Sequence, residues 1–223
     1  MKKFALSEVL VVLVFGGLLG FLGLTLRAAV AYPGGTFCEP DARSYRFWGN
    51  YFCDLTAPVT GRGIDNSLAA ASAHAAFASF ALALGPFFWL LAGLAGRRLI
   101  IRSCGLVSAF ATAVLAWVPS GFGPTLHATA VFGATVPGLV TAGVGVYGLG
   151  LRTVKQGLTR AAFALGVATF LAGFATAAGY AYVVATHGGC VPWLPVLQKA
   201  VGMLLVSWML LVALAAEGTV RAG

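Results

Sequence analysis

Long apolar stretches separated by short polar segments make up most of this chain. The stretches are rich in Leu, Val, Ala, Phe and Gly, and they predict helices at about 6–27, 70–95, 101–119, 128–151, 161–186 and 193–216. Their lengths suit the roughly 20 apolar residues that a helix needs to cross a bilayer. They lack the alternation of barrel strands, and a helix satisfies its own backbone groups in lipid. We therefore expect an all-α chain with one domain over residues 1–223, a polytopic six-helix transmembrane bundle.

Composition excludes most soluble classes of protein. The chain has 223 residues, of which 60% are hydrophobic and 9% are charged. A soluble domain carries roughly a quarter charged residues. Because so few charges cannot cover a globular surface in water, a soluble enzyme, a disordered regulator and a small disulfide-rich protein are excluded. An integral membrane protein remains.

The net charge of +8 takes its meaning from where the cations fall. With the N-terminus inside, the cytoplasmic side receives nine of the fourteen Lys and Arg residues: Lys2, Lys3, Arg97, Arg98, Arg102, Arg152, Lys155, Arg160 and Arg221. The outer side receives the other five: Arg27, Arg43, Arg46, Arg62 and Lys199. Cytoplasmic loops are enriched in Lys and Arg. We therefore expect both termini inside, the long loop at 28–66 outside, and no nucleic-acid partner.

The N-terminus has two interpretations. Lys2 and Lys3, an apolar run and the Ala-Val-Ala sequence at 29–31 resemble a secretory signal with its cleavage site. Against cleavage, the apolar run extends over about 18 residues, longer than a usual signal core, and Glu8 lies at its start. We expect an uncleaved first helix, and removal of residues 1–31 stays open.

Three of the four cysteines are expected outside, where disulfides form. Cys38 and Cys53 flank one loop, so the sequence favours a disulfide between them, with Cys190 as the rival partner. Cys104 is expected to pack as a small apolar side chain. The sequence contains no C-x-x-C spacing that would indicate a redox or metal site.

The segment at 143–148 matches G-x-G-x-x-G, the pattern of dinucleotide-binding loops. That use requires a strand before the motif, whereas here it falls inside a predicted membrane helix. We therefore interpret these glycines as small residues that allow close helix packing.

Polar side chains gather at the expected outer face. The candidates are His74, His127, His187, Asp54, Asp65, Asn50 and Asn66. Ionisable residues at membrane depth are costly and tend to mark functional sites. A histidine oriented by Asp54 would serve as a general base. No H-x-x-x-H or H-E-x-x-H motif is present, and we expect neither a metal nor another cofactor. Asn66 is also placed to cap the second helix.

The long loop resembles a six-helix bacterial membrane family of unknown function, DUF 998. The similar segments are Tyr-Pro-Gly-Gly at 32–35, Phe-Trp-Gly-Asn-Tyr-Phe-Cys-Asp-Leu at 47–55, Gly-Ile-Asp-Asn at 63–66 and Leu-His at 126–127. The resemblance implies a bacterial cytoplasmic (inner) membrane location and the site candidates Asn50, Asp54, Asn66 and His127. The family is in turn similar in layout to the DRAM and Frag group, which includes factors in lipid-anchor remodelling. It brings no established reaction.

Three functions fit these residues. The first is binding of a lipid headgroup or small solute in an outward-facing polar pocket, lined by Asn50, Asp54, Asp65, Asn66, His74 and His127. The second is an intramembrane hydrolase or transferase acting on a lipid or acyl group, with catalytic candidates Asp54, His74, His127 and His187. The third is a small transporter or a subunit of a membrane complex. Membrane lipids are the expected partners, and a homo-oligomer stays open.

Overall fold

The computed structural model describes residues 6–36, 38–118, 124–152, 157–186 and 190–221. These ranges contain the helices α1 (Leu6–Ala31), α2 (Ser67–Ala95), α3 (Arg98–Leu115), α4 (Pro124–Gly150), α5 (Gly157–Ala185) and α6 (Trp193–Arg221). A short 3-10 helix, η1 (Phe52–Thr56), lies between α1 and α2. All six α-helices are long and apolar enough to cross a membrane, which is compatible with a multi-pass membrane protein. The prediction of an all-α fold with six such helices is confirmed.

The helix ends differ from the sequence prediction by a few residues. Helix α1 continues past Arg27 to Ala31, and α3 ends at Leu115 rather than near 119. A long cationic side chain near a helix end reaches water without ending the helix, so a charge is a poor boundary marker. The helix η1 was not predicted, because its five residues are too few to show a helical period.

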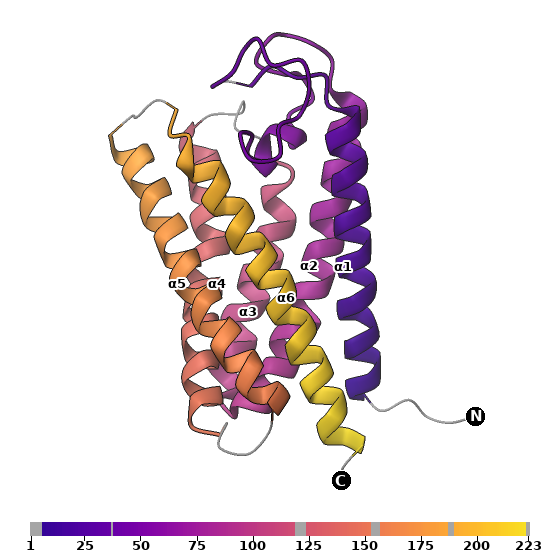
Figure 1. The fold of residues 1–223 in the computed structure, drawn as a ribbon, viewed down its shortest axis with the longest axis vertical. Helices are drawn as coiled ribbons and strands as arrows, with labels where there is room; N and C mark the ends of the chain where they lie inside the picture. Colours follow the sequence, from indigo (N-terminus) through magenta and orange to yellow (C-terminus); the bar gives the residue numbers. More distant parts are fainter. Residues whose placement is uncertain (1–5, 37, 119–123, 153–156, 187–189, 222–223) are drawn as a thin grey trace, which may run out of the picture.

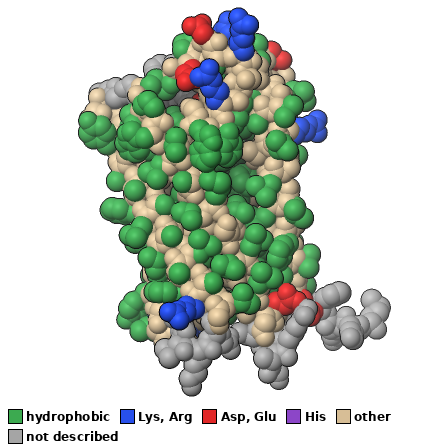
Figure 2. All heavy atoms as spheres, viewed as in Figure 1, with side chains coloured by type: hydrophobic (Ala, Val, Ile, Leu, Met, Phe, Trp, Pro, Cys, Tyr) green, Lys and Arg blue, Asp and Glu red, His purple; other side chains and the backbone are tan. Residues whose placement is uncertain are grey.

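Helix α2 is the centre of the bundle. It packs against α1, α3, α4 and α6, and further helix pairs in contact are α3 with α4, α4 with α5, α5 with α6 and α6 with α1. The face shown in Figure 2 is apolar along its middle, with the charged side chains at its two ends. Such a band of apolar side chains between charged ends is the surface that a bilayer requires.

Small residues bring these helices close together. A side chain at Gly17 of α1 would meet Ser79 and Ala83 of α2, and one at Gly148 of α4 would meet Ala95. Gly145 of α4 likewise faces another α2 side chain. The interpretation of the 143–148 glycines as packing positions is confirmed. In lipid, where apolar side chains gain little by leaving the solvent, this close approach supplies much of the attraction.

Residues 32–36 and 38–66, here called the cap segment, cover one end of the bundle (Figure 1). The described ends of α1 and α6 that lead to the termini are at the opposite end. A small apolar cluster seats the cap segment on α1 and α2: Ala28, Tyr32, Leu55, Ala69 and Ala73. This seat fixes the polar part of the cap segment above the N-terminal turns of α6.

Candidate functional site

A disulfide joins the cap segment to the chain just before α6. It pairs Cys38 with Cys190, whose Cα atoms are 5.3 Å apart, within the usual range for a disulfide. The prediction of a Cys38–Cys53 pair is therefore wrong, and the rival partner is the observed one. Cys53 lies in η1 and is a free thiol. Proximity along the loop misled the prediction, because folding of the cap segment brings Cys38 to the start of α6 instead.

Cys53 is half-buried beside Asp54. Burial, followed by the negative charge of Asp54, raises the pKa of the Cys53 thiol to about 12. Because the thiolate and not the thiol is the nucleophile, this side chain is poorly suited to covalent chemistry at neutral pH. It serves as a packing residue of η1.

Lys199 is a buried cation at the capped end. It lies in the second turn of α6, and its side chain is 0% exposed. An ammonium group removed from water loses several kcal/mol of hydration, so its surroundings must supply compensating contacts. The composition of those contacts therefore indicates what the site is built to hold.

The cap segment surrounds the Lys199 ammonium. Its Nζ donates a hydrogen bond to the backbone carbonyl of Asn50 at 2.5 Å. The ring centroid of Phe52 is 4.1 Å from Nζ. The rings of Phe47 and Tyr45 lie further off, at 5.6 and 5.7 Å. Aromatic faces attract cations electrostatically, so three rings and one carbonyl oxygen partly replace the lost water.

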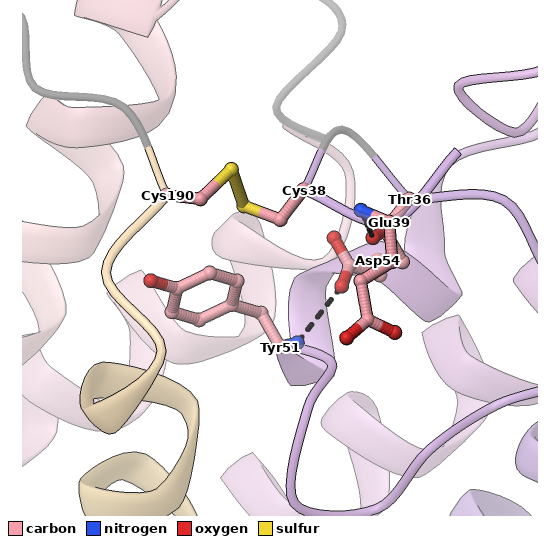
Figure 3. The surroundings of a disulfide bond; sticks show 6 residues. All are labelled: Thr36, Cys38, Glu39, Tyr51, Asp54 and Cys190. Atoms are coloured by element: carbon pink, nitrogen blue, oxygen red, sulfur yellow. Dashed lines mark hydrogen bonds between the residues drawn. A yellow bond between two sulfur atoms is a disulfide. The ribbon is translucent and has the colours of Figure 1, made fainter. Parts of the chain in front are cut away.

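Asp54 supplies a negative charge to the same cluster. Its Oδ2 accepts a hydrogen bond from the backbone N–H of Tyr51 at 2.8 Å (Figure 3). Burial raises the pKa of Asp54 to about 6, although the Tyr51 hydrogen bond, the Lys199 charge and the Asn50 side chain each lower it. Within the described residues no direct salt bridge joins Asp54 to Lys199. The carboxyl group is thus held close to Lys199 but incompletely compensated.

Two further polar atoms in this cluster have no hydrogen-bond partner among the described residues. They are the side-chain Nδ2 of Asn50 and the hydroxyl of Tyr45, both buried. Asn50 is 1% exposed, and its Oδ1 accepts a hydrogen bond from the backbone N–H of Arg46. That bond fixes the amide so that its N–H₂ group, a donor, is the end that acts on Asp54 and lowers its pKa, although without a hydrogen bond of full geometry. Buried polar groups are seldom left without partners, so each orphaned donor asks for an explanation.

Three links hold the start of α6 against the cap segment. They are the disulfide Cys190–Cys38, a hydrogen bond from the Phe52 N–H to Gln198 Oε1 at 3.0 Å, and the Lys199–Asn50 contact. Figure 3 shows the disulfide beside Tyr51 and Asp54. The cap segment is therefore positioned on α6 by covalent and polar contacts, over and above its apolar seat on α1 and α2.

The other loop candidates have structural partners outside this cluster. Asp65 is exposed and accepts hydrogen bonds from the backbone and hydroxyl of Ser67. Asn66 is buried, but its side chain makes no cap bond to α2; it donates instead to the carbonyls of Ala57 and Leu55. The prediction of Asn66 as the N-cap residue of α2 is confirmed for its position, but the side-chain hydrogen bond expected of a cap is not formed. Its amide ties η1 to the start of α2, which explains its burial.

The histidines are not brought together with Asp54 by any contact in the described chain. A ring nitrogen of His74 lies 3.2 Å from the carbonyl of Thr56, and its ring stacks against Trp117 at 4.6 Å. His127 Nδ1 lies 2.6 Å from the carbonyl of Val118. A carbonyl partner fixes a ring but does not activate it as a carboxylate would. His187 lies outside the described residues.

Sequence reasoning used Lys199 only as a charge for assigning the topology. The signal that would have found it is its position within the predicted helix at 193–216, six residues after its start. At 1.5 Å per residue that depth is about 9 Å, where an unpaired cation is costly. Tyr45, also missed, carries no sequence signal beyond lying in the loop.

The described residues contain no group of three or more His, Cys, Asp or Glu side chains placed to hold a metal ion. The side chains gathered around Lys199 instead offer an ammonium, an amide N–H₂ and a phenol. These groups are hydrogen-bond donors, which suit an anion. No protein-family model, no curated protein and no solved structure matches this chain.

Proposed function

We propose that this chain is a multi-pass membrane protein whose cap segment closes over an anion-binding site centred on Lys199. The ligand is a carboxylate or phosphate group, carried by a lipid headgroup or by a small solute. It enters from the capped end, which we propose to be the outer face. Asn50 and Tyr45 complete the donor set, and Asp54 adjusts the charge of the site.

The observation that carries this proposal is the surplus of buried donors. An ammonium has three N–H donors, and in the described chain the Lys199 ammonium gives one of them to a protein oxygen. The buried Tyr45 hydroxyl adds a second donor, and Asn50 Nδ2 adds a third that interacts with Asp54 without forming a full hydrogen bond. An oxyanion accepts several hydrogen bonds at once, and bonds to charged groups are about twice as strong as neutral ones. An anion would thus satisfy several orphaned donors together.

Asp54 makes the proposed binding dependent on pH. Because burial raises the pKa of this carboxyl to about 6, it loses most of its negative charge below that pH. The repulsion between Asp54 and an incoming anion then disappears, while Lys199 keeps its charge. Anion affinity is therefore expected to rise as the pH falls through about 6.

A second candidate function is an acyl or phosphoryl transferase or hydrolase at the membrane surface. The observation that favours it is the pairing of a carboxyl of raised pKa with a buried cation, an arrangement common at catalytic sites. In this version Asp54 accepts a proton from an attacking hydroxyl or water, and Lys199 stabilises the developing oxyanion. This replaces the earlier assignment of the base to His74 or His127. If Asp54→Asn loses turnover but still binds the ligand, the site is catalytic and does more than bind.

We also propose that the chain lies in a bacterial inner membrane with both termini in the cytoplasm. The cation distribution supports this orientation, since nine of the fourteen Lys and Arg residues fall in the parts of the sequence assigned to the cytoplasmic side. The resemblance of the loop to DUF 998 supports the location. Reporter fusions at residue 223 and within the cap segment give opposite signals if this orientation holds.

Assembly as a homo-oligomer or as a complex subunit is measured from the mass of the purified particle.

Mass spectrometry of lipids and small molecules retained by the purified chain tests the anion site. The informative variant is Asn50→Asp, because Asp keeps the oxygen that accepts the Arg46 N–H and replaces the free N–H₂ by a negative oxygen. We expect wild type to retain an anionic species that Asn50→Asp and Lys199→Gln lose. The matched control is Arg43→Gln, which removes an exposed cation of the same segment.

Melting temperature and elution volume show whether each variant is folded. Retention of the same anionic species by folded Asn50→Asp would refute the site, as would its equal loss in Arg43→Gln. A retained phospholipid identifies a headgroup as the source of the anion, whereas a retained carboxylate or phosphate metabolite identifies a solute.

A further inference from the structure

The second place where charge and burial coincide is the turn between α2 and α3, at the end opposite the cap segment. Arg102 of α3 stacks on Trp89 of α2, with the guanidinium carbon 3.8 Å from the ring centroid. Stacking on an aromatic face holds the planar guanidinium in one orientation and leaves its edge for hydrogen bonding. A fixed Arg edge is the geometry that recognises carboxylate and phosphate.

The edge of Arg102 is not fully used by the protein. Its Nε is buried and has no hydrogen-bond partner among the described residues. No described acidic side chain forms a salt bridge with it. Arg102 as a whole is half-buried, and a charged guanidinium without an acceptor is costly at this depth, so its accessible part calls for a partner outside the described chain.

The first turn of α3 adds two features that favour an anion. Arg98 is four residues before Arg102, which places both cations on one helix face, where like charges repel. Arg97, at the N-cap, makes no side-chain cap bond to the first-turn N–H groups of α3. Uncapped N–H groups and the positive end of the helix dipole attract anions. An anion here would relieve the repulsion and satisfy these donors together.

Apolar neighbours indicate that this anion belongs to a lipid. Leu99 and Leu106 lie about one turn on either side of Arg102 on the same side of α3, and they are 82% and 51% exposed. Arg102 is about 6 Å along the helix axis from the start of α3. At that depth a cation reaches the headgroup while the exposed leucines contact acyl chains. If the ligand were a free phosphate, the exposure of Leu99 and Leu106 beside Arg102 would have no explanation.

We propose that Arg98, Arg102, Trp89 and the first turn of α3 form a binding site for the phosphate of an anionic phospholipid in the leaflet opposite the cap segment. The site is separate from the one under the cap and does not depend on it. Arg102 makes the directed contact, Trp89 holds its orientation, and Arg98 with the helix end adds charge.

Lipid titration of the purified full-length chain in detergent, followed by native mass spectrometry, tests this site. We expect phosphatidylglycerol to bind about tenfold more tightly than phosphatidylcholine, which carries no net charge. Arg102→Gln should abolish that preference. Arg102→Lys, which keeps the charge but loses the planar edge, should lose most of it. The matched control is Arg160→Gln, which removes an exposed arginine in the first turn of α5 and should leave the preference within about twofold of wild type.

Two results would overturn the proposal. The first is an equal loss in Arg160→Gln and Arg102→Gln, which would show attraction by net charge alone. The second is displacement of phosphatidylglycerol by inorganic phosphate in large excess, which would identify a free anion as the ligand. Should Arg102→Gln fail to fold, Trp89→Leu provides the independent test. It keeps every charge but removes the stacking surface, so an unchanged preference in that variant would also refute the site.

Discussion

In the middle of the bundle the helices touch through glycine and alanine, whereas at the capped end α6 is joined to the cap segment by a disulfide, an amide and a buried ammonium. The two regions use different contacts because their surroundings differ. Lipid tails compete with any apolar contact, so the middle depends on close packing. The cap segment lies where water is available, and there burial of a charge has a large cost. Buried charge at the capped end is therefore the feature that packing does not explain.

The largest effect on the capped end should come from the disulfide. Replacing Cys38 and Cys190 by Ser is expected to lower the free energy of unfolding by about 2–4 kcal/mol, since the bridge closes a long loop. Melting curves measure the effect, and Cys53→Ser is the control because Cys53 is a free thiol. Peptide mapping without reductant checks the pairing, and a Cys38–Cys53 peptide would contradict it.

Gly17 and Gly16 give a matched test of the bundle middle. A side chain at Gly17 would meet Ser79 and Ala83, whereas one at Gly16 meets nothing within 4 Å. Gly17→Leu should therefore destabilise the chain by about 1–3 kcal/mol through overpacking, and Gly16→Leu by no more than about 0.5 kcal/mol. Thermal denaturation in one detergent compares them. Equal losses would mean that α1 and α2 do not pack through this glycine.

The pH dependence of stability distinguishes the capped end from the bundle middle, because Asp54 lies in the cap segment. Its folded pKa is raised, so its contribution to stability is full below the ordinary value near 3.8 and is lost as the pH rises through about 6. Asp54→Asn should remove this dependence and leave the variant more stable than wild type at pH 7.5, by on the order of 1–2 kcal/mol. Melting temperatures from pH 4 to 8 test it. A wild-type pH dependence that survives in Asp54→Asn would assign the titration to another group.

His127 should have the smallest effect, because its partner is a backbone carbonyl. His127→Ala is expected to cost about 1 kcal/mol of stability, the value of one hydrogen bond. It should leave the species retained by the purified chain unchanged. Comparing its retained lipids with those of wild type is the measurement, and a changed profile would restore His127 to the functional site.

The bundle was predictable because each membrane helix is specified by its own segment of sequence, whatever the rest of the chain does. About 20 apolar residues suffice, and the glycines of 143–148 were correctly assigned to packing. The cap segment depends on which distant residues meet, and no local pattern records that. Asn50 and Asp54 were identified as candidates, but their neighbour Lys199 lies 149 residues further along the chain from Asn50. The same limit explains the wrong cysteine pair, since Cys38 and Cys190 are separated by 152 residues.

Acetylation of lysines in the intact protein, mapped by mass spectrometry, is the most direct test of a cap segment closed over Lys199. Lys199 is 0% exposed and held by Asn50, so we predict that it stays unmodified while the disulfide is intact. It should become reactive once the disulfide is reduced and the cap segment is loosened by mild denaturant. Modification of Lys199 in the native, oxidised protein at the rate of a free lysine would contradict the account, because the ammonium would then face water rather than the cap segment.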